Sequence, residues 1–121
     1  MKILIKVTKE ILERSAMCGV RDWGRSTTCA VAVAVRDLFP AARIGYPSIS
    51  FDDGLSYYDK IMTPEMASFI GRFDDSTPEE RRAMSPISFE IDVPSEVIEK
   101  IGLQEVYKIL SESRTLELVA I

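Results

Sequence analysis

Seven consecutive apolar residues, 29–35 with the sequence CAVAVAV, form the longest apolar run of the chain. Ser26, Thr27 and Thr28 precede the run, and a short side-chain oxygen at such a position can cap the start of a helix. Pro40 follows it and cannot continue a helix. We therefore predict a helix over about 27–38 that is apolar on most of its circumference and hence buried. A buried strand is the alternative, because β-branched valines favour one.

The composition indicates one globular domain, 1–121, in which 94–121 form a C-terminal helix-plus-strand extension. The chain has 121 residues, of which 46% are hydrophobic and 28% charged, as is ordinary for a globular protein. No run approaches the roughly 18 apolar residues of a membrane span, and the first residues lack the apolar core of a signal peptide. We expect a cytoplasmic protein that does not contact membranes.

The cysteine and histidine content excludes several kinds of site. The two cysteines, Cys18 and Cys29, suggest neither a zinc site nor a disulfide framework. We expect Cys29 to be a small core residue and Cys18 to be partly exposed. The chain has no histidine, which removes the commonest general base and a common metal ligand. We expect no catalytic residue, no cofactor and no metal.

Periodicity and turn signals predict an α+β fold, with a mostly antiparallel sheet of four to five strands packed around the central helix of about 27–38. A hairpin is predicted around the Asp-Asp-Gly turn at 52–54. The capping-box spacing from Thr77 to Glu80 indicates a helix start; on that helix we interpret Arg81 and Arg82 as a solvated, locally paired face. The predicted strands are 1–7, 46–51, 55–62, 86–93 and 115–121, and the predicted helices are 9–15, 27–38, 63–74, 77–84, 94–100 and 103–113.

A candidate ligand site lies at the start of the central helix. The first turn of a helix offers unpaired N–H groups and the positive end of the helix dipole, which attract anions. Glycine permits close backbone approach, arginine gives a forked donor for phosphate or carboxylate, and a tryptophan ring can stack on a base. A capped core helix with a solvated arginine and a buried tryptophan is the alternative. The predicted site comprises Arg21, Trp23, Gly24, Arg25, Ser26, Thr27 and Thr28.

The net charge of −4 is unevenly distributed along the chain. Residues 14–43 hold five arginines and two aspartates, whereas 52–99 hold twelve acidic and four basic residues. Duplex nucleic acid needs a broad basic face, which this distribution does not provide. A small phosphorylated or nucleotide-like ligand is the better candidate.

The chain from 8 to 94 resembles a loose family of small, mostly uncharacterised proteins from phages and prophages. The residues that carry this resemblance are TKEILERS, CAVAVAVRDLFP, PEMASFIGRFD and SFEIDVP. The resemblance implies an architecture and a class of functions, interference with host defence, with no catalytic motif. Some proteins of that functional class are oligomers that sequester cyclic nucleotide or ADP-ribose-type signals without cleaving them. If the chain is phage-encoded, the expected location is the host cytoplasm.

We therefore expect a non-enzymatic phage-type anti-defence protein that binds and sequesters a small anionic, nucleotide-like ligand. The apolar tail 115–121 would add to the sheet or exchange with a neighbouring subunit, so a homo-oligomer is expected. The alternative is an acidic interaction module that inhibits a host enzyme, using residues such as Asp74, Asp75 and Glu79. An enzyme that uses carboxylates with Mg²⁺, at 52–53 or 74–75, is a third possibility with weaker support, since Asp-Asp-Gly is ordinary turn chemistry.

Overall fold

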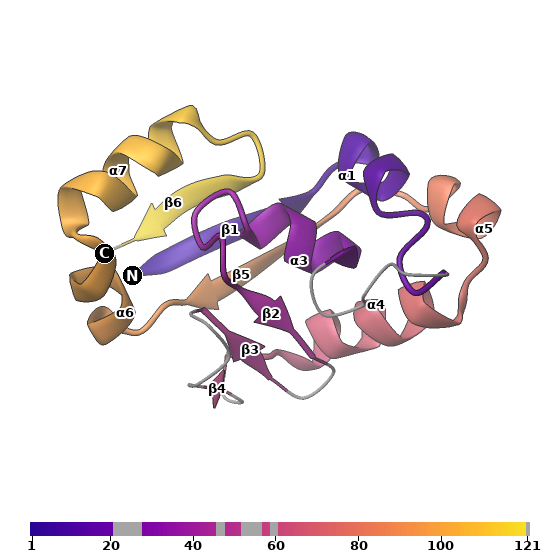
Figure 1. Ribbon diagram of the computed structural model, residues 1–121, viewed down its shortest axis with the longest axis horizontal. Coiled ribbons are helices and arrows are strands. Elements are labelled where there is room, and N and C mark those ends of the chain that lie inside the picture. Colours follow the sequence, from indigo (N-terminus) through magenta and orange to yellow (C-terminus); the bar gives the residue numbers. More distant parts are fainter. Residues whose placement is uncertain (21–27, 46–47, 52–56, 59–60, 121) are drawn as a thin grey trace.

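The computed structural model describes residues 1–20, 28–45, 48–51, 57–58 and 61–120 (Figure 1). These residues form an α+β fold with two small antiparallel sheets, in the strand orders β5-β1-β6 and β2-β3-β4. The fold class is confirmed, whereas the single sheet of four to five strands is corrected to two sheets. The described elements are β1 (Lys2–Val7), α1 (Lys9–Arg14), α3 (Ala30–Val35), β2 (Arg43–Ile44), β3 (Ile49–Ser50), β4 (Tyr57–Tyr58), α4 (Pro64–Asp75), α5 (Pro78–Arg82), β5 (Ile87–Asp92), α6 (Ser95–Ile101), α7 (Leu103–Glu112) and β6 (Leu116–Ala120).

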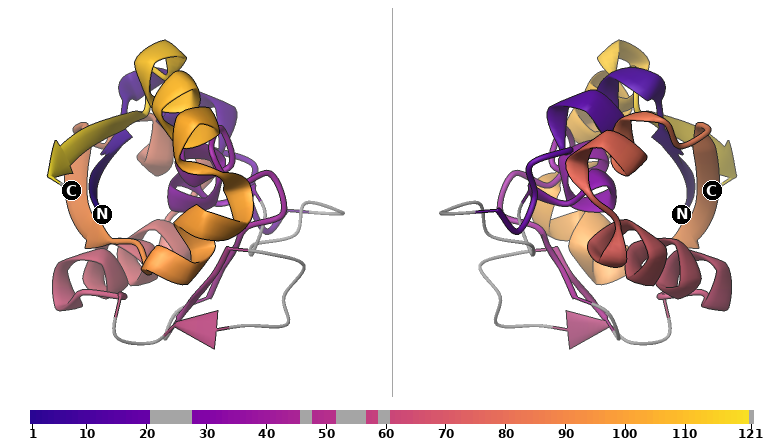
Figure 2. Two further views of the ribbon diagram at one scale, coloured as in Figure 1. Left: turned by 90° about the vertical axis from the view of Figure 1, so that its left-hand side faces the viewer. Right: turned by 90° about the vertical axis from the view of Figure 1, so that its right-hand side faces the viewer.

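The larger sheet has β1 in its middle, paired antiparallel with β5 and with β6. Successive side chains of a strand point to opposite faces, so Ile3 and Ile5 lie in the core while Lys2 is exposed. On β5 the same alternation buries Phe89 and Ile91 and exposes the residues between them. Figure 2 shows α3 on the apolar face of this sheet and β6 at one of its margins.

The central helix α3 is shorter than predicted but is buried as expected. It begins at Ala30, and Cys29 occupies the N-cap without a side-chain cap hydrogen bond. Every α3 residue except Val33 is buried, because alternating alanine and valine leave no polar stripe. The chain then continues past Arg36 in tight turns that bury Leu38 and Phe39. The helix ends before the predicted boundary of about 38.

The second sheet explains the correction to the predicted topology. The predicted hairpin is present as β3 and β4, with Ile49 opposite Tyr58, although both strands are two residues long. β3 pairs on its other side with β2, a strand that the sequence pattern had not indicated. The Asp-Asp-Gly turn at 52–54 lies outside the described residues. The hairpin strands therefore join β2 and leave the larger sheet with three members.

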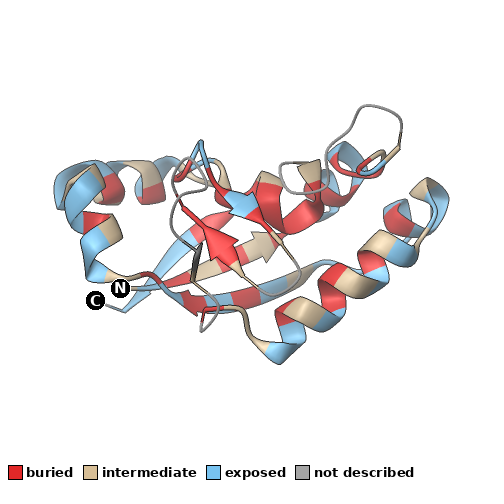
Figure 3. Ribbon diagram, turned by 60° about the horizontal axis from the view of Figure 1, so that its bottom comes forward, coloured by how far each residue is buried: buried red, intermediate tan, exposed pale blue. Residues whose placement is uncertain are grey.

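Helices α4 and α5 begin where local signals predicted. Thr63 caps α4 by accepting from the Met66 amide at 3.2 Å, and Thr77 and Glu80 complete a capping box at α5. The inner face of α4 is buried and its outer face exposed (Figure 3). The interpretation of Arg81 as a solvated residue is wrong: its relative exposure is 3%.

The C-terminal segment completes the fold. Gly102 separates α6 from α7 at φ 100°, a conformation that glycine adopts without strain. α7 leads into β6, which confirms the predicted C-terminal strand and places it beside β1. The Thr115 hydroxyl lies 2.8 Å from the Ala34 carbonyl and so connects this segment to α3. In the described part of the chain, no helix has both the length and the apolar character needed to cross a membrane.

Candidate functional site

Most of the ligand site predicted from the sequence lies outside the described residues, namely Arg21, Trp23, Gly24, Arg25, Ser26 and Thr27. Thr28 is described and is half-buried. The first residues of α3 are buried, with Cys29 at 3% and Ala30 at 0% relative exposure. The amides at the start of α3 are therefore shielded from solvent. The helix start at Ala30 is not exposed and so does not support a ligand site at 21–28. That site stays a prediction.

Two cysteines lie next to this segment, and both are buried. Cys18 has a relative exposure of 1%, which corrects the expectation that it is partly exposed. The pKa of the Cys29 thiol is raised to about 12, mainly by burial, with smaller contributions from Cys18 and Asp74 and with two backbone hydrogen bonds that oppose the increase. A thiol that stays protonated at neutral pH is a poor nucleophile and a poor metal ligand. Cys29 is thus a core residue, as the sequence predicted.

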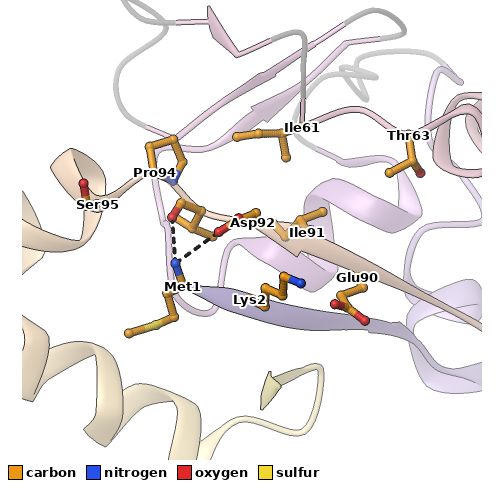
Figure 4. A pocket seen from close by; sticks show the side chains of 10 residues that line it. Met1, Lys2, Ile61, Thr63, Glu90, Ile91, Asp92, Pro94 and Ser95 are labelled. Atoms are coloured by element: carbon orange, nitrogen blue, oxygen red, sulfur yellow. Dashed lines mark hydrogen bonds and ion pairs between the residues drawn. The ribbon is translucent and has the colours of Figure 1, made fainter. Parts of the chain in front are cut away.

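A hollow of about 740 Å³ lies beside β5 (Figure 4). Ile61 and Thr63 lie across this hollow from Lys2 and Glu90. The Asp92 carboxylate lies 3.1 Å from the Met1 amino group. Glu90 and Asp92 balance the charges of Lys2 and the Met1 amino group, so this hollow carries no net charge.

Another hollow, of about 470 Å³, is lined by side chains of both charges. It is lined by Lys9, Arg14 and Arg114, together with the acidic side chains of Glu10 and Glu112 among others. The Lys9 ammonium donates to the carbonyl oxygens of Arg82 and Met84. Basic and acidic side chains therefore lie together in this hollow, and neither sign of charge prevails.

A hollow of about 490 Å³ has the most apolar lining of the three. We call it the aromatic pocket. It lies between the turn that follows α3, the end of β3 and the helices α6 and α7. Its volume is within the range of about 300–1,000 Å³ typical of small-molecule sites. Its lining residues are Asp37, Leu38, Phe39, Pro40, Ala41, Phe51, Val97, Lys100, Ile101 and Ile109.

Aromatic contacts hold one wall of the aromatic pocket. The ring centroids of Phe39 and Phe51 are 4.7 Å apart, and those of Phe51 and Tyr58 are 5.7 Å apart. The Tyr58 hydroxyl donates to Glu96 on α6 at 3.1 Å. This row of rings connects the second sheet to the helix that forms the opposite wall, so the pocket is bounded by packed elements.

Two charged residues border the aromatic pocket. Lys100 lies on α6, is exposed and is one of the lining residues. Asp37 contributes a carboxylate whose Oδ2 lies 3.0 Å from the Thr115 hydroxyl. A ring could lie against the aromatic and aliphatic side chains, an anionic group near Lys100, and a hydroxyl or amino group near Asp37. Among the described residues, no group of three or more potential side-chain ligands could hold a metal ion.

Sequence reasoning missed the aromatic pocket because its residues belong to four separate segments. The sequence did predict that a helix cannot continue past Pro40. No local spacing relates Phe39 to Lys100, which meet only through the packing of α6 against the turn after α3. A contact prediction between these segments is the signal that would have located the pocket.

Comparisons of this chain with protein-family models, with curated proteins and with solved structures found no match.

Proposed function

We propose that this protein is a non-enzymatic binding protein that holds a small anionic, nucleotide-like ligand in the aromatic pocket. The observation that carries the proposal is a mainly apolar pocket of about 490 Å³ that has Lys100 among its lining residues. Such a combination suits a ligand that has a flat ring and a negative charge. Binding of this kind requires neither a general base nor a metal.

The proposal keeps the ligand class suggested by the sequence and moves the site. The residues predicted first, at 21–28, and the aromatic pocket are separate candidates for the same ligand. The biological role that we propose is sequestration of a host signalling nucleotide by a phage-type anti-defence protein. That role is supported by the sequence resemblance alone.

The test is a thermal-unfolding assay of the 121-residue chain with AMP, cyclic AMP and ADP-ribose, with adenosine and inorganic phosphate as partial ligands. A ligand at about 100 times its dissociation constant should add about 2.7 kcal/mol to the free energy of unfolding. We expect at least one nucleotide to raise the melting temperature, and adenosine or phosphate alone to raise it less. No shift with any nucleotide at millimolar concentration would contradict the proposal.

Charge-reversal variants locate the site. Lys100→Glu should abolish the nucleotide shift, because it places a carboxylate beside the anionic group. Lys108→Glu is the matched control, since this lysine is exposed on α7 and does not line the pocket. Arg25→Glu tests the site predicted from the sequence: loss of binding in this variant, with Lys100→Glu unaffected, would overturn the pocket assignment and keep the ligand class.

A further inference from the structure

The outer edge of β6 carries peptide groups that point away from the sheet. The Lys6 amide donates to the Thr115 carbonyl at 2.7 Å, and Leu4 lies opposite Glu117 in the same register. Peptide groups of neighbouring residues alternate in direction along an antiparallel pair. The peptide groups of Glu117 therefore face β1, and the N–H and C=O of Leu118 face outward. The Leu116 amide also faces outward but donates to Ser113 Oγ at 3.0 Å, so the open stretch begins at Leu118.

The side chains of this open stretch are apolar. Leu118 and Val119 have relative exposures of 36% and 47%. The charged residue of β6 is Glu117, whose carboxylate lies 3.3 Å from the Lys6 ammonium. Edge strands normally avoid pairing with other chains by carrying charges, prolines or bulges on the edge. The register of β6 against β1 shifts between Leu118 and Ala120, opposite Ile3 and Lys2, so a bulge lies directly after Leu118, and Leu118 itself carries neither a charge nor a proline.

The other edge of the same sheet is protected by charge. The Val93 amide donates to the Met1 carbonyl at 2.8 Å, so by the same alternation the peptide groups of Glu90 and Asp92 face outward on β5. Both carboxylates are exposed. Two β5 edges would bring like charges together, and a β6 edge against a β5 edge would place apolar side chains beside carboxylates and leave a free edge at each end.

We propose that β6 pairs antiparallel with β6 of a second copy of this chain, with Leu118 opposite Leu118 about a twofold axis. Each Leu118 N–H then donates to the Leu118 carbonyl of the other copy, and the two three-stranded sheets become continuous. The pairing brings no uncompensated charge to the contact, since Glu117 is already paired with Lys6. A single strand pair buries less than the roughly 1,200 Å² of a stable interface, so the dimer is reversible, with a dissociation constant in the micromolar to millimolar range. This inference is independent of the ligand proposal.

Sedimentation equilibrium over a concentration series from about 10 µM to about 1 mM tests the dimer. The wild-type chain should shift from monomer to dimer, and Leu118→Lys should stay monomeric over the whole series. Leu103→Lys is the matched control, because Leu103 is also exposed, at 48%, but lies on α7; this variant should dimerise like the wild type. A wild-type chain that is monomeric throughout, or equal loss of dimer in both variants, would overturn the proposal.

Amide hydrogen exchange of the wild-type chain gives a second test that needs no substitution. The Leu118 amide should exchange quickly in dilute solution and at least tenfold more slowly at high concentration. The Glu117 amide, which faces β1, should be protected at both concentrations. A Leu118 amide whose exchange does not depend on concentration would contradict the pairing, even if the chain self-associates by another surface.

Discussion

Arg81 Nη1 donates a hydrogen bond of 2.9 Å to the carbonyl oxygen of Ala16, a residue 65 positions earlier in the chain. The same guanidinium donates to the carbonyls of Cys18, Phe73 and Asp74 and lies over the Phe73 ring at 4.3 Å. It thereby joins α5, the end of α4 and the turn after α1. These carbonyls satisfy the donors of a side chain that would otherwise be costly to bury.

Replacement of Arg81 by alanine should strongly destabilise the fold. The substitution removes four hydrogen bonds to backbone carbonyls and the packing against Phe73. We expect a loss of about 2–4 kcal/mol in the free energy of unfolding, measured by urea denaturation. Arg82→Ala is the matched control: this neighbouring arginine on α5 is exposed, and its loss should change stability by less than about 0.5 kcal/mol. Equal effects of the two substitutions would contradict the role of Arg81.

Local signals predicted the parts of the fold whose causes are local. Thr63 and Thr77 cap helices where the sequence indicated, and the alternation of 87–92 predicted β5. The burial of Arg81 was mispredicted because its partners Ala16 and Cys18 are more than 60 residues away. The charge pattern Glu-Glu-Arg-Arg looks the same for an exposed and a buried arginine.

The pairing of β3 with β2 and the position of the aromatic pocket also depend on contacts between distant segments. The hairpin could be predicted from its turn residues, but its pairing with β2 depends on where the turn after α3 places Arg43 and Ile44. The aromatic pocket likewise requires α6 and α7 to pack beside Phe39 and Phe51. Neither arrangement leaves a periodic signal in the sequence.

Because the pKa of the Cys29 thiol is raised, we predict that the fold loses stability at alkaline pH. Its pKa is raised from 9.0 to about 12 by burial, so the folded state holds a proton that the unfolded state releases above pH 9.0. The contribution of the protonated Cys29 thiol to the free energy of unfolding is therefore complete below pH 9.0. It is lost as the pH rises toward about 12, by up to roughly 1.4 kcal/mol per pH unit. The comparison is the free energy of unfolding at pH 8 and pH 10 for the wild type and Cys29→Ala. The wild type should lose more stability between these values; an equal loss would show that another group causes it.

The Thr115 hydroxyl connects β6 to α3, and we predict that its hydrogen bond contributes to the free energy of unfolding. It lies 2.8 Å from the Ala34 carbonyl and 3.0 Å from Asp37 Oδ2, and its single proton serves one acceptor at a time. Thr115→Val keeps the shape but removes the donor, and we expect a loss of about 1–2 kcal/mol by urea denaturation. Thr115→Ser keeps the hydroxyl and should lose less. If serine were as destabilising as valine, the contribution would come from the methyl group and not from the hydrogen bond.

The aromatic pocket is the place where we propose that a nucleotide-like ligand binds. Methyl-resolved NMR during a titration with AMP, cyclic AMP or ADP-ribose tests this directly, because Val97, Ile101 and Ile109 line the pocket and Ile3 and Ile5 lie in the core. We predict saturable shifts of the three pocket methyl groups and small changes at Ile3 and Ile5. Saturable shifts elsewhere with unchanged pocket methyl groups, or no shifts at all, would contradict the account.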